Sequence, residues 1–254
     1  KGSAKEDADC MINLGCILEQ SEEYPHDYAR AFELYLKASE QGNGRAYNNL
    51  GTCYKRAIGT AKDAKKAIEC YEKAIEKGCQ EGYWNLYLYY MDEVCTPRDF
   101  TKAVEWLKKG DQADVLQCTY QLTKHYMHGD GVESDARKYF ECLYKASNQG
   151  YEEAYNELGN CYKYGVGTEQ DGSSAFEWYQ KAADQGQSDA QFNLGYMYQY
   201  GQGVKQDYFK AVEWFQKAAD QGDASAQCYL GVMYEEGRGV KQDYFKAVEW
   251  YQKA

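Results

Sequence analysis

The chain repeats one pattern of apolar and polar positions every 36 residues. Counting from Asp7, seven copies follow one another without insertion or deletion, at 7–42, 43–78, 79–114, 115–150, 151–186, 187–222 and 223–254. Position 8 of a copy is always Leu, position 21 always Asp and position 31 always Lys. The phrase GVKQDYFKAVEW stands unchanged at 203–214 and 239–250. A fixed period of this length predicts an array of stacked structural repeats.

Each copy is predicted to form two helices. Apolar or small residues recur at positions 4, 8, 11 and 12 and again at 25, 26, 28, 29 and 32, a spacing that puts each set on one face of a helix. We expect the first helix over positions 2–14 and the second after position 21. In the sixth copy the first stripe is Ala190, Leu194, Met197 and Tyr198. In the repeated phrase, the predicted packing stripe is Phe209, Ala211, Val212 and Trp214, which recurs as Phe245, Ala247, Val248 and Trp250.

Asp and Gly mark the ends of these helices. The Asp at position 21 is expected to cap the second helix, because its carboxylate can accept the free N–H groups of the first turn. Gly at position 36 closes that helix. The pair Gly201 and Gly203 resembles part of a phosphate-binding loop, but no strand precedes it and no Gly-Lys-Ser/Thr follows, so it predicts a helix–helix turn. Gly at position 9, inside the first helix, predicts that the second helix packs closely against it.

The charge balance disfavours two classes of partner. The formal net charge is −11, whereas nucleic acids and anionic membrane surfaces attract basic proteins. No apolar run approaches the roughly 18 residues that a membrane helix needs, so no membrane insertion is expected.

Residues 1–6 are expected to be a cloning remnant or a flexible N-terminus.

Most cysteines occupy positions that other copies fill with apolar or small side chains. These are Cys10 and Cys118, Cys53 and Cys161, and Cys70 and Cys142. We therefore expect buried, reduced thiols and a cytoplasmic protein. Cys118, His125, Cys142 and Cys161 fall on core positions of the fourth and fifth copies and could in principle hold zinc. Their spacing matches no known ligand pattern, so the sequence predicts neither a metal nor another cofactor.

The copies resemble the Sel1-like repeat, a relative of the tetratricopeptide repeat. The pattern is A-x-x-x-L-G-x-x-Y, then G-x-G-V, then D-x-x-K-A-x-x-W-Y-x-K-A-A-x-x-G. The sixth copy carries it as Ala190, Leu194, Gly195, Tyr198, Gly201, Gly203, Asp207, Lys210, Ala211, Trp214, Lys217, Ala218 and Gly222. The third copy departs at Tyr87, Glu93 and Cys95, and the fourth at Thr123. The resemblance implies an all-α, right-handed α/α superhelical solenoid of about seven repeats of 36 residues.

The resemblance also implies a scaffold or adaptor that binds a peptide or protein, and no reaction of its own. Two alternatives stay open: a regulatory or substrate-positioning module of a larger enzyme, and a β-lactam- or cell-wall-related activity like that proposed for secreted cysteine-rich relatives. Those relatives carry paired cysteines in every repeat, which this chain lacks. The three histidines and the scattered carboxylates suggest no catalytic group.

Binding is expected on first-helix residues that point away from the second helix, by similarity to tetratricopeptide repeats. These are roughly positions 3, 6, 10, 13 and 14, which vary between copies as a recognition surface does. Asn can bond both groups of a peptide backbone, and aromatic or Met side chains can act as anchors. The predicted groove residues are Asn48, Thr52, Arg56, Trp84, Leu88, Met91, Tyr120, Lys124, Met127, His128, Asn156, Asn160, Tyr164, Phe192, Tyr196 and Tyr200. The alternative is that the aromatic residues among them only pack against the neighbouring copy.

Overall fold

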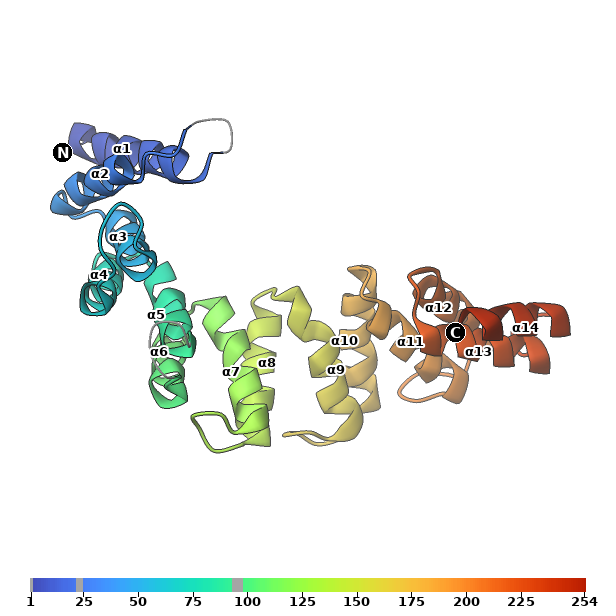
Figure 1. Cartoon of the computed structure of the whole chain (residues 1–254). Coiled ribbons are helices and arrows are strands. Elements are labelled where there is room, and N and C mark those ends of the chain that lie inside the picture. Colours follow the sequence, from blue (N-terminus) through green and yellow to red (C-terminus); the bar gives the residue numbers. More distant parts are fainter. Residues whose placement is uncertain (1, 22–24, 93–97) are drawn as a thin grey trace. The chain divides into compact units, whose positions relative to one another are not determined.

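The computed structural model describes residues 2–21, 25–92 and 98–254. The regular secondary structure of these residues is all helical, with turns and loops between the helices and no strand. The odd-numbered α-helices are the first helices of the copies and the even-numbered ones the second (Figure 1). The chain divides into two compact units, Lys1–Glu133 and Ser134–Ala254. The division falls inside the fourth copy, so α7 belongs to unit 1 and α8 to unit 2. No helix of the described residues is both long and apolar enough to cross a bilayer.

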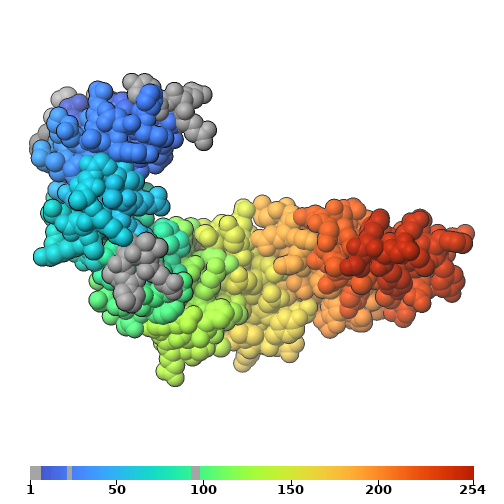
Figure 2. All heavy atoms as spheres, viewed as in Figure 1, coloured from blue at the N-terminus to red at the C-terminus, as the bar shows by residue number. Residues whose placement is uncertain are grey.

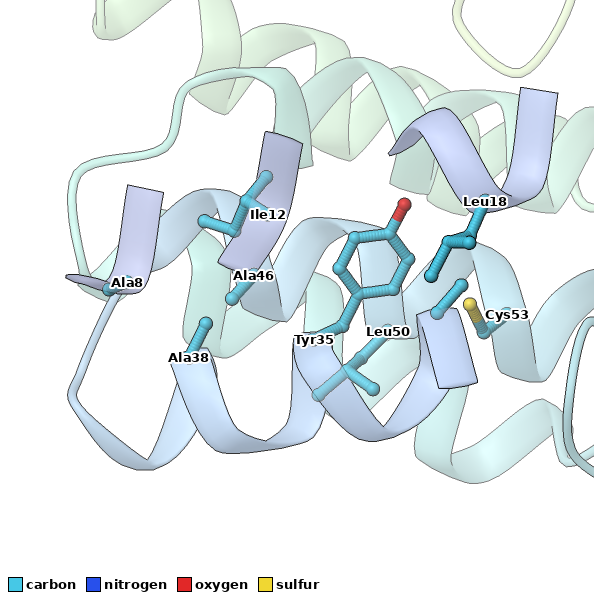
Figure 3. Close-up of a cluster of buried hydrophobic side chains, with 9 residues drawn as sticks. Ala8, Ile12, Leu18, Tyr35, Ala38, Ala46, Leu50 and Cys53 are labelled. Carbon is cyan, nitrogen blue, oxygen red and sulfur yellow. The ribbon is translucent and has the colours of Figure 1, made fainter. Parts of the chain in front are cut away.

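Unit 1 contains the first seven helices. They are α1 (Gly2–Gln20), α2 (Tyr28–Glu40), α3 (Gly44–Arg56), α4 (Ala64–Glu76), α5 (Glu81–Met91), α6 (Phe100–Gln112) and α7 (Leu116–His128). Each helix packs on the next one along the chain. Figure 3 shows how Ile12 and Leu18 of α1, Tyr35 of α2, and Leu50 and Cys53 of α3 gather in one core cluster. The core therefore runs from one copy into the next.

Unit 2 contains the remaining elements. They are α8 (Ala136–Asn148), the 3₁₀ turn η1 (Glu152–Ala154), α9 (Tyr155–Tyr164), α10 (Gly172–Asp184), α11 (Ser188–Tyr200), α12 (Tyr208–Asp220), α13 (Ala224–Glu236) and α14 (Tyr244–Lys253). In the space-filling view of this unit the copies follow one another as adjoining bands from yellow to red (Figure 2). Leu194 and Met197 of α11 pack with Tyr179 of α10, and Phe215 of α12 packs with Leu230 of α13.

The predicted N-caps are confirmed in all seven copies. At position 21, the Asp side chain accepts a hydrogen bond from a backbone N–H in the first turn of the second helix. The residues are Asp27, Asp63, Asp99, Asp135, Asp171, Asp207 and Asp243. Backbone donors at Lys66, Lys102 and Lys138 lower the pKa values of Asp63, Asp99 and Asp135. This cap stabilisation is present above the pKa of an unfolded Asp and is lost as pH falls through the folded-state value.

The predicted close approach at position 9 is also confirmed. A Cβ added to Gly195 would lie 2.6 Å from the ring of Phe215, and one added to Gly51 would lie 2.6 Å from the ring of Tyr71. Both rings are buried at position 29 of the same copy. In the third copy, Tyr87 replaces the glycine and Leu107 replaces the aromatic ring. A larger first-helix residue thus faces a smaller second-helix residue, and both are buried. The other two departures in this copy, Glu93 and Cys95, lie outside the described residues.

Glycine at position 17 joins successive copies. A Cβ on Gly203 would collide with the backbone carbonyl group of Gly172, at the start of the preceding copy's second helix. Gly239 approaches Tyr208 in the same way. Gly203 and Gly239 both have φ of 69°. Since the obstacle is backbone, no side-chain rearrangement can relieve it, and only glycine fits.

Some predictions of core packing are wrong. Phe209 is 72% exposed and Phe245 is 87% exposed, so position 23 lies outside the packing stripe of the repeated phrase, and Val248, at position 26 of the last copy, is exposed as well. In the first copy Cys10, Leu14 and Ile17 are exposed, although positions 4, 8 and 11 were predicted to be core. Position 4 packs on the second helix of the preceding copy, as the contact of Cys118 with Gly110 shows. Among the described residues, no second helix packs on the face of α1 that carries position 4.

Candidate functional site

All sixteen predicted groove residues lie on first helices, and none is fully buried. We call the two sets the first-helix surface of unit 1 and the first-helix surface of unit 2. The first comprises Asn48, Thr52 and Arg56 on α3, Trp84, Leu88 and Met91 on α5, and Tyr120, Lys124, Met127 and His128 on α7. The second comprises Asn156, Asn160 and Tyr164 on α9 and Phe192, Tyr196 and Tyr200 on α11. Their place on the surface agrees with a binding role.

The predicted asparagines are already bonded to neighbouring side chains. Asn85 Nδ2 donates to Asn48 Oδ1 at 2.7 Å in unit 1, and Asn193 Nδ2 donates to Asn156 Oδ1 at 3.2 Å in unit 2. The Tyr179 hydroxyl donates to Asn160 Oδ1 at 2.7 Å. Because the Oδ1 atoms of these asparagines already accept hydrogen bonds, a bound ligand would accept hydrogen bonds mainly from their Nδ2 groups.

Sequence reasoning missed the donors in this arrangement, which occupy position 7. Asn85, Asn193 and Gln121 each reach back to the first helix of the preceding copy, Gln121 through a 2.8 Å bond to the Tyr87 hydroxyl. Position 7 is Asn or Gln in five of the seven copies, at Asn13, Asn49, Asn85, Gln121 and Asn193. That recurrence in the sequence could have indicated a shared role for the amides at position 7. Because these amides hold adjacent first helices in register, they shape the surface.

The first-helix surface of unit 2 contains a pocket of about 770 Å³. Tyr164, Phe192 and Tyr196, all predicted, line it together with Lys163, Asn193 and Tyr229, which were not among the named residues, although Lys163 stands at position 13, one of the predicted positions. The Lys163 ammonium lies 4.7 Å from the centre of the Tyr196 ring and donates to Asn193 Oδ1 at 3.3 Å. One cation among aromatic rings and amides can bind an anionic or polar group beside an apolar one.

The first-helix surface of unit 1 contains a smaller pocket of about 400 Å³. Asn48 and Trp84 line it, joined by Asn85 and by Gln80 and Gln117 from neighbouring segments. The Trp84 ring packs against the Tyr87 ring, with 4.9 Å between the two ring centroids. An indole beside several amides offers an apolar contact and hydrogen bonds to an extended backbone.

One predicted anchor also serves the core. Phe192 lies 5.7 Å from the ring of Phe215 and 5.4 Å from that of Tyr229, measured between centroids. The alternative considered for the aromatic residues, packing against the neighbouring copy, thus applies to this side chain. Tyr164 and Tyr200, in contrast, are largely exposed. They are the better residues for testing binding without disturbing the core.

The histidines make local hydrogen bonds. His125 is buried with its Nδ1 atom 2.9 Å from the backbone oxygen of Asp130, and His128 Nδ1 lies 2.8 Å from the backbone oxygen of Lys124. Within the described ranges, no three His, Cys, Asp or Glu residues come together as a metal site.

The cysteines of the described segments are all free thiols in different surroundings. Cys53, Cys118 and Cys161 are buried as predicted, and burial raises the pKa of each to about 12. Cys10, predicted to be buried, is exposed, as is Cys228, and Cys70 and Cys142, also predicted to be buried, are only half-buried.

We expect iodoacetamide to alkylate Cys10 and Cys228 in the folded protein, while Cys53, Cys118 and Cys161 stay unmodified. The three buried thiols have neither access nor thiolate character at neutral pH. Mass spectrometry of peptides after timed alkylation measures this, and the same reaction in guanidinium should modify every cysteine. Equal rates for Cys10 and Cys118 in the folded state would contradict the packing described here.

Comparison with known proteins points to one family. The model of the Sel1 repeat matches seven times, at 8–43, 44–79, 82–110, 117–151, 152–187, 188–223 and 224–254. The crystal structure of c5321, a protective antigen present in uropathogenic Escherichia coli strains with an SLR fold, is 31% identical, with a TM-score of 0.82. The match covers 99% of this chain and 54% of that protein, so the chain spans about half its length.

A second crystal structure, of a Sel1 repeat protein from Oxalobacter formigenes, is also 31% identical, with a TM-score of 0.70. It is matched over 99% of this chain and 73% of its own. A comparison with proteins of curated function finds no match.

Proposed function

Because this chain belongs to the Sel1 repeat family, whose solenoids are generally protein-interaction modules, we propose that it is a scaffold or adaptor that binds a peptide or protein partner. The partner is held on the first-helix surfaces. The observation that carries this proposal is the pocket of about 770 Å³ on α9 and α11, which is lined by three of the predicted residues, Tyr164, Phe192 and Tyr196.

The chemistry of both first-helix surfaces supports a peptide ligand. Aromatic side chains give a large contact area at a small cost in conformational entropy, and amides bond to peptide N–H and C=O groups. Each surface combines the two: Trp84 with Asn48 in unit 1, and Tyr196 with Asn193 in unit 2. On either surface, an extended segment can then bond through its backbone while one of its side chains enters the pocket of that surface.

The test begins with peptides selected on the immobilised chain from a displayed random dodecapeptide library. The double variant Tyr164→Ala/Tyr200→Ala should weaken peptides bound to unit 2 at least about tenfold, because exposed aromatic anchors dominate such contacts. The double variant Leu88→Ala/Met127→Ala should do the same for peptides bound to unit 1. Fluorescence polarisation measures both.

The matched control is Phe209→Ala/Phe245→Ala. These aromatic side chains are as exposed as Tyr164, but they lie on second helices outside both surfaces. Binding that survives the surface variants and is lost in the control would overturn the proposal. All variants should keep the melting temperature of the parent, because none of the changed side chains is buried.

A further inference from the structure

Lys163, in the unit 2 pocket, has no carboxylate partner among the residues that the structure describes. Its Nζ atom lies 5.1 Å from the centre of the Tyr164 ring and 4.7 Å from that of Tyr196, and its hydrogen-bond acceptor is the neutral amide of Asn193. Among the residues that line the pocket, Lys163 alone carries a charge. Aromatic rings and one neutral amide balance the positive charge of the Lys163 ammonium group only partly, so the pocket should bind a ligand that brings a negative charge.

The repeat register shows which position would supply the carboxylate. Lys55 occupies position 13 of the second copy, as Lys163 does in the fifth. Lys55 Nζ pairs at 3.0 Å with Asp92, at position 14 of the next copy. The residue equivalent to Asp92 beside Lys163 is Tyr200, which is neutral. Unit 1 therefore satisfies this lysine within the chain, whereas unit 2 does not.

We propose that the unit 2 pocket binds the carboxylate of an Asp or Glu side chain within a partner's peptide segment, with Lys163 as the counter-ion. The inference rests on the proposed function and specifies the partner's chemistry. Lys163 is half-buried, so its attraction for an anion is screened less than that of an exposed lysine. The rings of Tyr196 and Tyr229 lie in the same pocket and suit an apolar residue next to the acid.

The surroundings favour a single acidic side chain over a chain terminus or an acidic run. The Asn156–Asn193 pair and Tyr200 lie on the same first helices as the pocket, and Tyr200 contacts the Tyr196 ring, so we expect a bound segment to extend beyond Lys163 over these residues. The net charge of −11 repels a ligand with many carboxylates. An isolated acid flanked by apolar residues avoids most of that repulsion.

The first test uses the dodecapeptides selected on the intact chain from a library displayed without a free C-terminus. The peptides whose binding is weakened by Tyr164→Ala/Tyr200→Ala should commonly contain one Asp or Glu next to an apolar residue. Lys163→Gln should weaken them by about tenfold to a hundredfold, the usual worth of a hydrogen bond to a charged group. Lys55→Gln, at the same repeat position in unit 1, should leave their affinity unchanged.

The second test restores the missing carboxylate. Tyr200→Asp places an acid where Asp92 stands in unit 1, so it should pair with Lys163 and weaken the acidic peptides about tenfold or more. Tyr200→Asn removes the same ring without adding a charge, so it should weaken the acidic peptides less than Tyr200→Asp does, and the difference between the two variants measures the pairing with Lys163. Unchanged melting temperatures show that each variant is folded.

The outcomes separate this inference from the proposed function. Selected peptides that need Tyr164 and Tyr200 but show no acidic enrichment, or bind Lys163→Gln as well as the parent, overturn the carboxylate site and leave peptide binding standing. Binding only by peptides with a free C-terminus also overturns it, in favour of a terminal carboxylate. Failure to select any peptide contradicts both.

Discussion

Replacing Gly195 with Ala should destabilise unit 2 by about 1–3 kcal/mol, although alanine is the better helix former by about 1 kcal/mol. The added Cβ would lie 2.6 Å from the ring of Phe215. That ring is fully buried and is held by Phe192 and Tyr229, so it has little room to move. Urea denaturation followed by tryptophan fluorescence measures the loss, since Trp178, Trp214 and Trp250 all belong to this unit.

The third copy supplies the compensating change. There Tyr87 stands at the glycine position and Leu107 at the ring position, and both are buried. Phe215→Leu should therefore recover part of the stability that Gly195→Ala loses, so the double variant should be more stable than the sum of the two single effects predicts. Strict additivity, or stabilisation by Gly195→Ala alone, would show that these two positions are not in contact.

Replacing Gly203 with Ala should cost more, about 2–5 kcal/mol. The residue has φ of 69°, a conformation that costs an L-residue about 1–2 kcal/mol, and overpacking adds about 1–3 kcal/mol. The overpacking arises because the added Cβ would meet the carbonyl group of Gly172 in the preceding copy. We therefore expect the sixth copy to pack less tightly on the fifth. Urea denaturation of the intact chain measures the loss.

Gly201 is the matched control for that experiment. Its φ is 66°, but an added Cβ would lie 3.3 Å from Gln206 Cβ and 3.4 Å from the Gln206 backbone N, so it would meet no atom as closely as a Cβ at Gly203 meets Gly172. Gly201→Ala should therefore show the backbone penalty alone, about 1–2 kcal/mol. If the two variants lose equal stability, the contact between copies at Gly203 contributes nothing.

The sequence predicted the features that repeat in every copy, because each copy meets nearly the same neighbours. The Asp207 cap, the Gly195 contact and the helix boundaries follow from local rules and from a period of 36 residues. The errors arise where neighbours differ or where a side chain points outward. Cys10 lies on a face of α1 that no second helix of the described residues covers, and Phe209 is an aromatic residue on the outside of α12.

The candidate site could be located by helix and face, but its chemistry could not be fully derived. The first-helix positions that differ between copies were predicted to form the binding surface, and three of the residues at these positions, Tyr164, Phe192 and Tyr196, line one pocket. Lys163 stands at position 13, which was expected to face the groove, but the residue itself was not named, and Asn193 was missed because position 7 was not assigned to the groove. Only the structure shows that an aromatic ring from the next copy lies over Lys163 and that its acceptor is an amide.

The central claim is that partners bind where the copies differ, on the first helices, and not on the exposed side chains of the repeated phrase. Photo-crosslinking tests it most directly, with p-benzoylphenylalanine placed at the position of Tyr164 in one protein and of Phe209 in another. These side chains are 64% and 72% exposed, so access is nearly the same. The account predicts crosslinks to a bound dodecapeptide from position 164 and none from position 209. The reverse pattern would contradict it.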